Sequence, residues 1–190
     1  HLIILSSYYG NTEEVIDAFY AAKKQNCATV VIAAGGSLLE LAEEYGVPYI
    51  KLPDTGIQPR MALGFSVMAL FKIIGEESTL KEFARLSKTL KPKDFEKRGA
   101  ALSEKIKGFI PVIYSSDANR ALACNWKIKF NETGKIPAFY NIFPELNHNE
   151  MTGFSALGEA AGIPAPNKLF RFIFLRDNAD HPQIIKRMDV

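Results

Sequence analysis

Residues 2–24 read LIILSSYYGNTEEVIDAFYAAKK and combine three local patterns. The apolar run Leu2–Leu5 predicts a short buried strand, and residues 6–12 form a polar turn. Apolar side chains then recur at helical spacing through residues 13–24. A strand, a turn and an amphipathic helix in this order are typical of one βα unit of a parallel sheet.

The same alternation continues along the chain and predicts an α/β fold. We predict further strands over 28–33, 47–52, 109–114, 138–143 and 169–175. We predict helices over 37–45, with Ser37 as its N-cap, over 58–74 and over 119–130. Residues 184–190 are predicted to be the beginning of another helix. Residues 2–24 and 110–130 are weakly similar, since each has a strand, a Ser-Ser turn and a helix, so we expect two similar halves.

A charged stretch divides the two halves. Residues 78–107 are rich in Lys, Arg and Glu and are broken once, by Pro92. A solvated helical connector explains this composition better than a basic binding patch does. We therefore expect a first domain over 1–77, a helical connector over 78–107 and a second domain over 108–190.

Composition excludes several classes of protein. The 23 Lys and Arg residues nearly balance the 21 Asp and Glu residues, so a nucleic-acid partner is not indicated. No apolar window is long enough to span a membrane. Cys27 and Cys124 are too few for a disulfide framework, and we expect buried thiols in a reducing cytosol. Three His and no His-x-x-x-His pair do not indicate a metal site.

The polar turn at residues 6–14 is the first candidate site. It follows a strand and precedes a helix, where hydroxyls, backbone N–H groups and the helix dipole can bind an anion such as phosphate. The Walker and G-x-G-x-x-G spacings are absent, which disfavours nucleotides. A simple capping turn, with Thr12 as N-cap, explains the same residues. Gly35-Gly36-Ser37 likewise fits either a ligand-binding turn or a plain strand-to-helix turn.

Several motifs carry a resemblance to a known family. Ser7-x-x-Gly-Asn-Thr12-Glu-Glu resembles the phosphosugar-binding loop of sugar isomerase (SIS) domains. Gln58-Pro-Arg60, Asn131-Glu132, Lys135-Ile-Pro-Ala138 and Pro144-Glu-Leu-Asn-His-Asn-Glu150 resemble the bifunctional phosphoglucose/phosphomannose isomerases, in order along the chain. The resemblance implies two SIS-like halves, each flavodoxin-like, with a parallel sheet in a three-layer αβα arrangement.

The resemblance also implies an activity and its residues. It implies reversible isomerisation of glucose 6-phosphate, and of mannose 6-phosphate, with fructose 6-phosphate through a cis-enediol, without metal or cofactor. The implied phosphate-binding residues are Ser7, Tyr9 and Thr12. Arg60 is implied to stabilise the enediolate, Glu132 to move the proton and His148 to open the sugar ring, and these residue types suit those roles.

The residues alone also permit plainer roles. Glu132 ends a helix and could be solvated, and His148 could be a structural loop histidine. Glu145 and Glu150 flank His148 and could orient it or cap the next helix. Tyr9 replaces a serine that the family carries in its phosphate loop, and the bulk of the phenol could displace the oxygen it replaces.

The resemblance extends to partners and to the extent of the chain. It implies a cytoplasmic homodimer in which His148 reaches the active site of the neighbouring subunit. Relative to the family, we expect a chain truncated at both ends, without the C-terminal helix that carries a catalytic Lys, and Lys186 stands too early to take that role. The alternatives are a non-catalytic phosphosugar-binding module and an isomerase of amino sugar phosphates.

Overall fold

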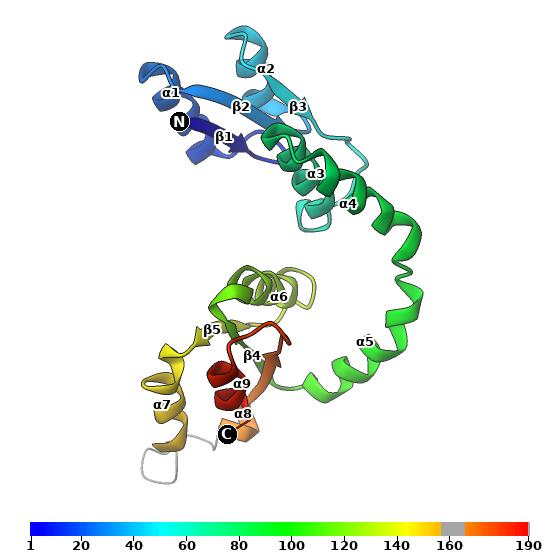
Figure 1. Ribbon diagram of the computed structural model, residues 1–190, viewed down its shortest axis with the longest axis vertical. Helices are drawn as coiled ribbons and strands as arrows, with labels where there is room; N and C mark the ends of the chain where they lie inside the picture. Colours follow the sequence, from blue (N-terminus) through cyan, green and yellow to red (C-terminus); the bar gives the residue numbers. More distant parts are fainter. Residues whose placement is uncertain (157–165, 190) are drawn as a thin grey trace. The chain divides into compact units, whose positions relative to one another are not determined.

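The computed structural model describes residues 1–156 and 166–189 (Figure 1). The chain divides into two compact units, His1–Pro92 and Lys93–Val190. The division falls between two helices, α4 (Glu77–Thr89) and α5 (Lys93–Ile106). These helices occupy most of the charged stretch that we expect to be a connector.

The first unit is built on a parallel sheet of three strands. The strands are β1 (Leu2–Ser6), β2 (Ala28–Ala33) and β3 (Tyr49–Lys51), in the order β1-β2-β3. The predicted strands are therefore confirmed, although β3 is shorter than residues 47–52. Among the described strands, β3 pairs with β2 alone and so lies at one side of the sheet. Pro48, which directly precedes β3, fits this position because proline cannot donate a hydrogen bond to a neighbouring strand.

Helices cover both faces of this sheet. On one face, α1 (Glu13–Lys24) and α2 (Gly36–Glu44) bury Phe19 and Leu38 against Val31. On the other face, α3 (Leu63–Ile74) packs Ala69 against Ile32. A one-turn 3-10 helix, η1 (Pro59–Met61), precedes α3. Alternate β2 side chains thus enter opposite layers, as the strand period requires, and the predicted three-layer arrangement is confirmed.

The second unit repeats the plan with a different strand order. Its strands are β4 (Ile110–Ser116), β5 (Phe139–Phe143) and β6 (Phe170–Leu175), all parallel, in the order β5-β4-β6. The central strand runs beyond the predicted end at Tyr114. Ser115 and Ser116 were expected in a turn, but Ser115 pairs with both neighbouring strands and Ser116 with β5. The turn instead begins at η2 (Asp117–Asn119).

Helices also cover both faces of the second sheet. On one face, α6 (Arg120–Glu132) packs Ala123 against Ile113. On the other face, Leu146 of η3 (Glu145–Asn147) and Met188 of α9 (Pro182–Met188) pack around Tyr114. The remaining helices are α7 (Glu150–Ala156) and α8 (Pro166–Leu169). The predicted terminal helix is confirmed, and Val190 lies outside the described residues.

Two further expectations concern the cysteines and the membrane. Cys27 and Cys124 are unpaired but only half-buried, because Cys27 lies in the turn before β2 and Cys124 on the flank of α6. The expectation of buried thiols is therefore wrong. Among the described residues, no helix is both long and apolar enough to cross a membrane.

Candidate functional site

The turn between β1 and α1 turns its hydroxyls toward one another. Ser7 Oγ and Thr12 Oγ1 lie 2.8 Å apart, and Ser7 Oγ also accepts the N–H of Gly10 at 3.2 Å. Thr12 holds the N-cap position of α1, yet its side chain makes no capping hydrogen bond. The Thr12 hydroxyl thus faces Ser7 across the turn. This placement fits a hydroxyl that can bind a ligand. A simple capping turn would instead have the Thr12 side chain accept a backbone N–H of α1.

This turn is packed against the turn between β2 and α2. Gly10 and Gly36 both have positive φ, and a Cβ on Gly10 would overlap the carbonyl oxygen of Gly35. The N–H of Leu38 donates to the carbonyl of Gly10 at 2.9 Å. The Gly35-Gly36 turn therefore packs directly on the first turn. Glycine is required at Gly10 and Gly36, where a Cβ would overlap the backbone of the facing turn.

The same contact corrects the prediction for Ser37. Ser37 lies inside α2, whose N-cap is Gly35. The N–H of Ser37 donates to Asn11 Oδ1 at 3.0 Å, so a side chain 26 residues earlier supplies the acceptor that a local cap would give. Asn11 therefore ties the candidate phosphate loop to the start of α2, a role that local spacing did not indicate.

A cavity of about 320 Å³ opens beside this loop. Its lining residues are Ser7, Tyr8, Tyr9, Asn11, Thr12 and Pro59. Pro59 starts η1, which follows β3, so the turn that carries Arg60 borders the cavity of the Ser7 loop. All four candidate residues of the first unit thus lie at the edge formed by the carboxyl ends of its strands, where parallel sheets bind ligands.

Tyr9 stands at the mouth of this cavity. Its side chain is 54% exposed, and its ring packs edge-on against that of Tyr8, with centroids 5.2 Å apart. Tyr8 is itself anchored, since its hydroxyl donates to the carbonyl of Pro53 at 3.4 Å. The phenol of Tyr9 therefore lies toward solvent, whereas Ser7 is buried at the base of the turn.

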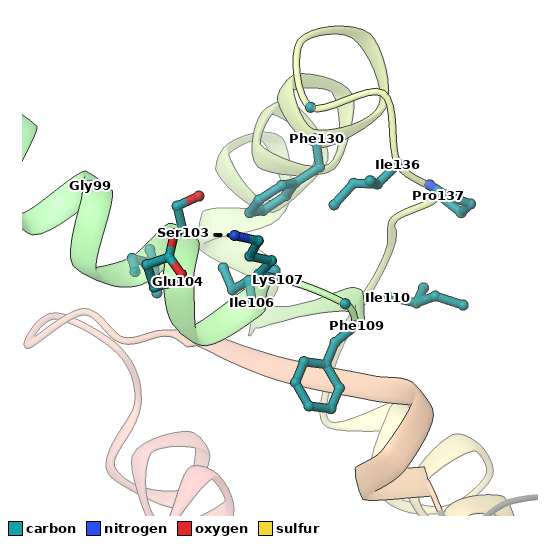
Figure 2. Close-up of a pocket in the computed structure, with 13 residues that line it drawn as sticks. Gly99, Ser103, Glu104, Ile106, Lys107, Phe109, Ile110, Phe130, Ile136 and Pro137 are labelled. Atoms are coloured by element: carbon teal, nitrogen blue, oxygen red, sulfur yellow. Dashed lines mark ion pairs between the residues drawn. The ribbon is translucent and has the colours of Figure 1, made fainter.

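Glu132 ends α6 in the second unit and leads into a tight loop. Asn131 Nδ2 donates to the carbonyl of Ile136 at 3.0 Å, and Lys135 adopts a positive φ. The Glu132 side chain is exposed at this loop. A cavity of about 610 Å³ opens beside the loop, and Figure 2 shows Phe130, Ile136 and Pro137 from this region with residues from the end of α5 and from Phe109–Ile110.

The cavity of Figure 2 is mostly apolar. Its polar side chains belong to Ser103, Glu104 and Lys107 of the α5 region, and Lys107 Nζ pairs with Glu104 at 3.8 Å. It therefore lacks the convergent donors that a sugar phosphate needs, and the hydroxyl-lined cavity of the first unit is the better phosphate site.

His148 follows β5 and so lies at the carboxyl ends of the strands, whereas Glu132 precedes β5 and lies at their amino ends. Phe143-Pro144 leads into η3, where Leu146 is fully buried, and His148 comes directly after it with an exposed side chain. The N–H of His148 donates to the carbonyl of Glu145 at 3.0 Å. The backbone at His148 is thus held while its imidazole faces solvent.

Glu132 and His148 are consequently separated by the length of a strand. Glu132 precedes β5, and His148 follows it. The five residues of β5 span about 15 Å at the usual strand rise. Within one copy of this unit, the two candidate catalytic side chains therefore lie at opposite ends of the strands and do not meet.

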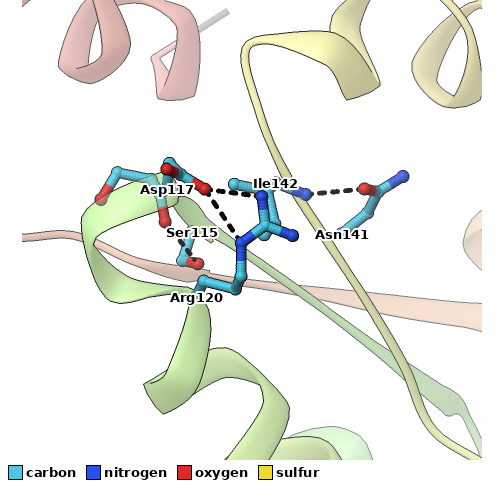
Figure 3. Close-up of polar contacts among 6 residues, drawn as sticks. Ser115, Asp117, Arg120, Asn141 and Ile142 are labelled. Carbon is cyan, nitrogen blue, oxygen red and sulfur yellow. Dashed lines mark hydrogen bonds and ion pairs between the residues drawn. The ribbon is translucent and has the colours of Figure 1, made fainter. Parts of the chain in front are cut away.

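Sequence reasoning missed a polar cluster that joins β4 and β5 to the start of α7. Glu150 Oε1 accepts from the Tyr114 hydroxyl at 2.8 Å, and Glu150 Oε2 accepts from Asn141 Nδ2. Figure 3 shows that Asn141 Oδ1 in turn accepts the N–H of Ile142, at 2.8 Å. The motif Pro144–Glu150 contained Glu150, but nothing local indicated that its partners lie on two strands.

The electrostatics of this cluster are set by Tyr114. Burial raises the pKa of the Tyr114 hydroxyl well above its usual range, and the hydrogen bond and negative charge of Glu150 raise the pKa further. Tyr114 is therefore a proton donor to Glu150 at every pH near neutrality. Nearby, Arg120 donates to Asp117 Oδ1 through Nε at 2.9 Å and Nη2 at 2.6 Å (Figure 3).

No group of His, Cys, Asp and Glu side chains with the arrangement of a metal site occurs within residues 1–156 and 166–189. The candidate chemistry in the described parts of the chain thus consists of hydroxyls, one guanidinium, one carboxylate and one imidazole. This set suits the binding of an anion and the transfer of protons.

Comparisons with known proteins bear on both units. Residues 95–190 match the family described as the bacterial phospho-glucose isomerase C-terminal SIS domain. Over its whole length, the chain is 36% identical to a bifunctional phosphoglucose/phosphomannose isomerase of Caldicellulosiruptor bescii, of which it covers 58%. It is 31% identical to the corresponding Aquifex aeolicus protein, of which it covers 57%. The chain thus spans somewhat more than half the length of these relatives.

A solved structure with a similar fold is the glucosamine-6-phosphate deaminase of Thermotoga maritima. The TM-score is 0.64, the identity is 13%, and the match covers 99% of this chain and 56% of that one. At this identity the likeness concerns the fold alone. It agrees with the parallel, three-layer units described above.

Proposed function

The chain belongs to the bacterial phosphoglucose isomerase family, and from this membership we propose that it forms part of an aldose–ketose isomerase. The proposed reaction interconverts glucose 6-phosphate, and also mannose 6-phosphate, with fructose 6-phosphate through a cis-enediol. No metal or cofactor is needed for the proton transfers of this reaction. The observation that carries the proposal is the facing pair of hydroxyls, Ser7 and Thr12, in a cavity that Pro59 of the Arg60 turn also lines.

Ser7, Tyr9 and Thr12 bind the substrate phosphate in this proposal. The Ser7 and Thr12 hydroxyls can each donate to a phosphate oxygen once they release one another. The N-terminus of α1, a helix of 12 residues, adds the positive end of its dipole. Tyr9 reaches the phosphate from the exposed side of the cavity.

The remaining residues act on the carbons of the sugar. Arg60 stabilises the negative oxygen of the enediolate, for which a permanently charged guanidinium is suited. Glu132 moves the proton between C1 and C2, and His148 opens the sugar ring by proton transfer at the ring oxygen. A carboxylate and an imidazole are the side chains that carry out such transfers near neutral pH.

A homodimer provides the arrangement that these roles require. Glu132 and His148 lie at opposite ends of the strands of one sheet, so one copy does not place both on one substrate. In a two-fold dimer, His148 of one copy can join Glu132 of the other, and this exchange occurs twice. The unpaired cysteines support a cytoplasmic location for the dimer.

Complementation between inactive variants tests the proposal. Glu132→Gln and His148→Ala are each expected to lose isomerase activity. When the two variants are mixed and allowed to exchange subunits, heterodimers form that contain one complete site, and roughly a quarter of the parent activity returns. The control is a mixture of Glu132→Gln with the double variant, in which no site is complete and no activity returns.

Other outcomes separate the alternatives. Recovery that fails although subunits exchange would show that Glu132 and His148 do not share a site across the dimer. A Glu132→Gln protein as active as the parent would remove Glu132 from the reaction. Fructose 6-phosphate binding by calorimetry without any turnover by the parent chain would favour the non-catalytic phosphosugar-binding module.

A further inference from the structure

The carboxylate of Glu150 connects the start of α7 to two strands of the second sheet. Its two oxygens accept hydrogen bonds from the Tyr114 hydroxyl, at 2.8 Å, and from Asn141 Nδ2. Tyr114 is 1% exposed. The amide of Asn141 is oriented as well, because its oxygen accepts the N–H of Ile142. The Tyr114 hydroxyl and the Asn141 amide are therefore held in place by contacts other than those with Glu150.

The segment between β5 and α7 is anchored on both sides of His148. Before His148, the Leu146 side chain is fully buried in the core around Tyr114. After it, Asn149 Oδ1 accepts the N–H of Glu150 at 2.5 Å, and Thr152 Oγ1 donates to the carbonyl of His148 at 3.4 Å. His148 is thus an exposed residue that lies between two anchors.

The second anchor is unusual for its type of residue. A Glu at the first position of a helix commonly lies in solvent, where the helix dipole is enough to favour it. Glu150 instead turns its carboxylate into the protein, and such a charge is stable there only when its oxygens are satisfied by donors. Tyr114 and Asn141 supply those donors, so the arrangement fixes the backbone two residues after His148.

We propose that Glu150 is a positioning residue that holds the imidazole of His148 where it can open the sugar ring. The inference rests on the proposed function, in which His148 performs that step. Glu150 does not touch the substrate, and it acts by fixing the segment that carries His148. A displacement of about 1 Å in a catalytic group can reduce a rate about 100-fold, which sets the size of effect to look for.

Two substitutions separate position from charge. Glu150→Ala removes both acceptors. Glu150→Gln keeps both hydrogen bonds, because its oxygen can accept from Asn141 and its NH₂ group can donate to the Tyr114 oxygen. We expect kcat for fructose 6-phosphate to fall about 10- to 100-fold in Glu150→Ala, with KM within about twofold of the parent, and Glu150→Gln to stay within about threefold in kcat.

A substrate that cannot cyclise distinguishes positioning of His148 from general damage. 5-Deoxyfructose 6-phosphate lacks the hydroxyl that closes the ring, so it needs no ring opening. Glu150→Ala is expected to turn it over within about threefold of the parent rate. Equal losses on both substrates would mean that Glu150 supports the fold rather than His148, and would overturn the proposal.

Controls separate this proposal from the proposed function. Glu145→Ala removes the other acid beside His148, whose exposed carboxylate accepts from Asn149 Nδ2 at 3.1 Å, and it should match the parent on both substrates. If His148→Ala itself turns over fructose 6-phosphate at the parent rate, the proposed role of His148 is wrong. If His148→Ala loses that activity while Glu150→Ala keeps it, the role of Glu150 alone is wrong.

A readout without turnover completes the test. In Glu150→Ala, the backbone N–H groups of Asn147 and His148 should exchange with solvent at least about tenfold faster than in the parent, whereas those of β4 should not change. Glu150→Gln should restore the parent rates. Unchanged exchange at His148 in Glu150→Ala would show that Glu150 does not hold this segment.

Discussion

Gly10 and Gly35 meet backbone to backbone, so closely that a Cβ on Gly10 would overlap the carbonyl oxygen of Gly35. Gly10 also has a φ of +72°. Gly10→Ala therefore combines a steric clash with a strained backbone, and we expect it to lower the free energy of unfolding of the first unit by about 3 kcal/mol or more. Denaturant unfolding monitored by circular dichroism measures the change.

Gly46→Ala is the matched control for this prediction. Gly46 has a φ of +63°, and a Cβ there would meet nothing within 4 Å. Its substitution therefore adds backbone strain without a clash, which costs about 1 to 2 kcal/mol. If the two variants were equally stable, the close approach of the two turns would not hold in solution.

Asn11→Ala tests the hydrogen bond between the two turns. It removes the acceptor for the N–H of Ser37, and we expect a loss of about 1 kcal/mol in the free energy of unfolding. Asn11→Asp keeps the acceptor and places a negative charge at the N-terminus of α2, so it should be at least as stable as the parent. Thermal unfolding compares the three proteins. An Asn11→Asp protein as unstable as Asn11→Ala would contradict the capping role.

Local patterns predicted the elements but not the contacts between them. The run 28–33 is apolar because β2 is buried on both faces, so its strand was readable from sequence. The N-cap assigned to Ser37 was wrong, because the acceptor comes from Asn11, which lies 26 residues away in the sequence. A local rule cannot see a partner that only the packing of two turns brings close.

The candidate site shows the same limit. The hydroxyls of Ser7 and Thr12 share one turn, so the sequence could place them together. Glu132 and His148 lie on either side of the strand predicted over 138–143, so their separation could also be predicted from the sequence. Tyr114 and Glu150 are 36 positions apart and share a hydrogen bond. The pairing of β4 with β5 places Tyr114 beside Asn141, where both can bond Glu150, and no local pattern indicates that pairing.

Tyr9→Ser tests the departure of this loop from the pattern it resembles. A serine at this position would bring a compact hydroxyl beside Ser7 and Thr12 in place of an exposed phenol. If the serine hydroxyl makes a better placed hydrogen bond to phosphate than the phenol does, we expect about a three- to tenfold lower Kd for fructose 6-phosphate. Titration calorimetry measures the Kd.

The control for this prediction is Tyr20→Ser. Tyr20 is 48% exposed on α1, outside the residues that line the cavity, so the Kd should stay that of the parent. Weaker binding by Tyr9→Ser would mean that the phenol of Tyr9 binds the phosphate better than a serine hydroxyl does at this position.

Tyr114→Phe tests the buried hydroxyl through the dependence of the free energy of unfolding on pH in the alkaline range. Burial and then Glu150 raise the pKa of Tyr114 above its ordinary value of about 10. Below about pH 10 the hydroxyl is protonated in both the folded and the unfolded chain, so its full contribution to stability is present. Above that pH the unfolded chain releases the proton while the folded chain keeps it, and the contribution declines by about 1.4 kcal/mol per pH unit.

The parent should therefore exceed Tyr114→Phe in free energy of unfolding at neutral pH by about 1 to 3 kcal/mol, because the variant leaves an oxygen of Glu150 without its donor. As the pH rises above about 10, this difference should shrink by about 1.4 kcal/mol per pH unit. Urea unfolding at a series of pH values gives both curves. Two curves that stay parallel above pH 10 would mean that the Tyr114 hydroxyl titrates alike in the folded and unfolded chain, and that Glu150 does not hold it as a donor.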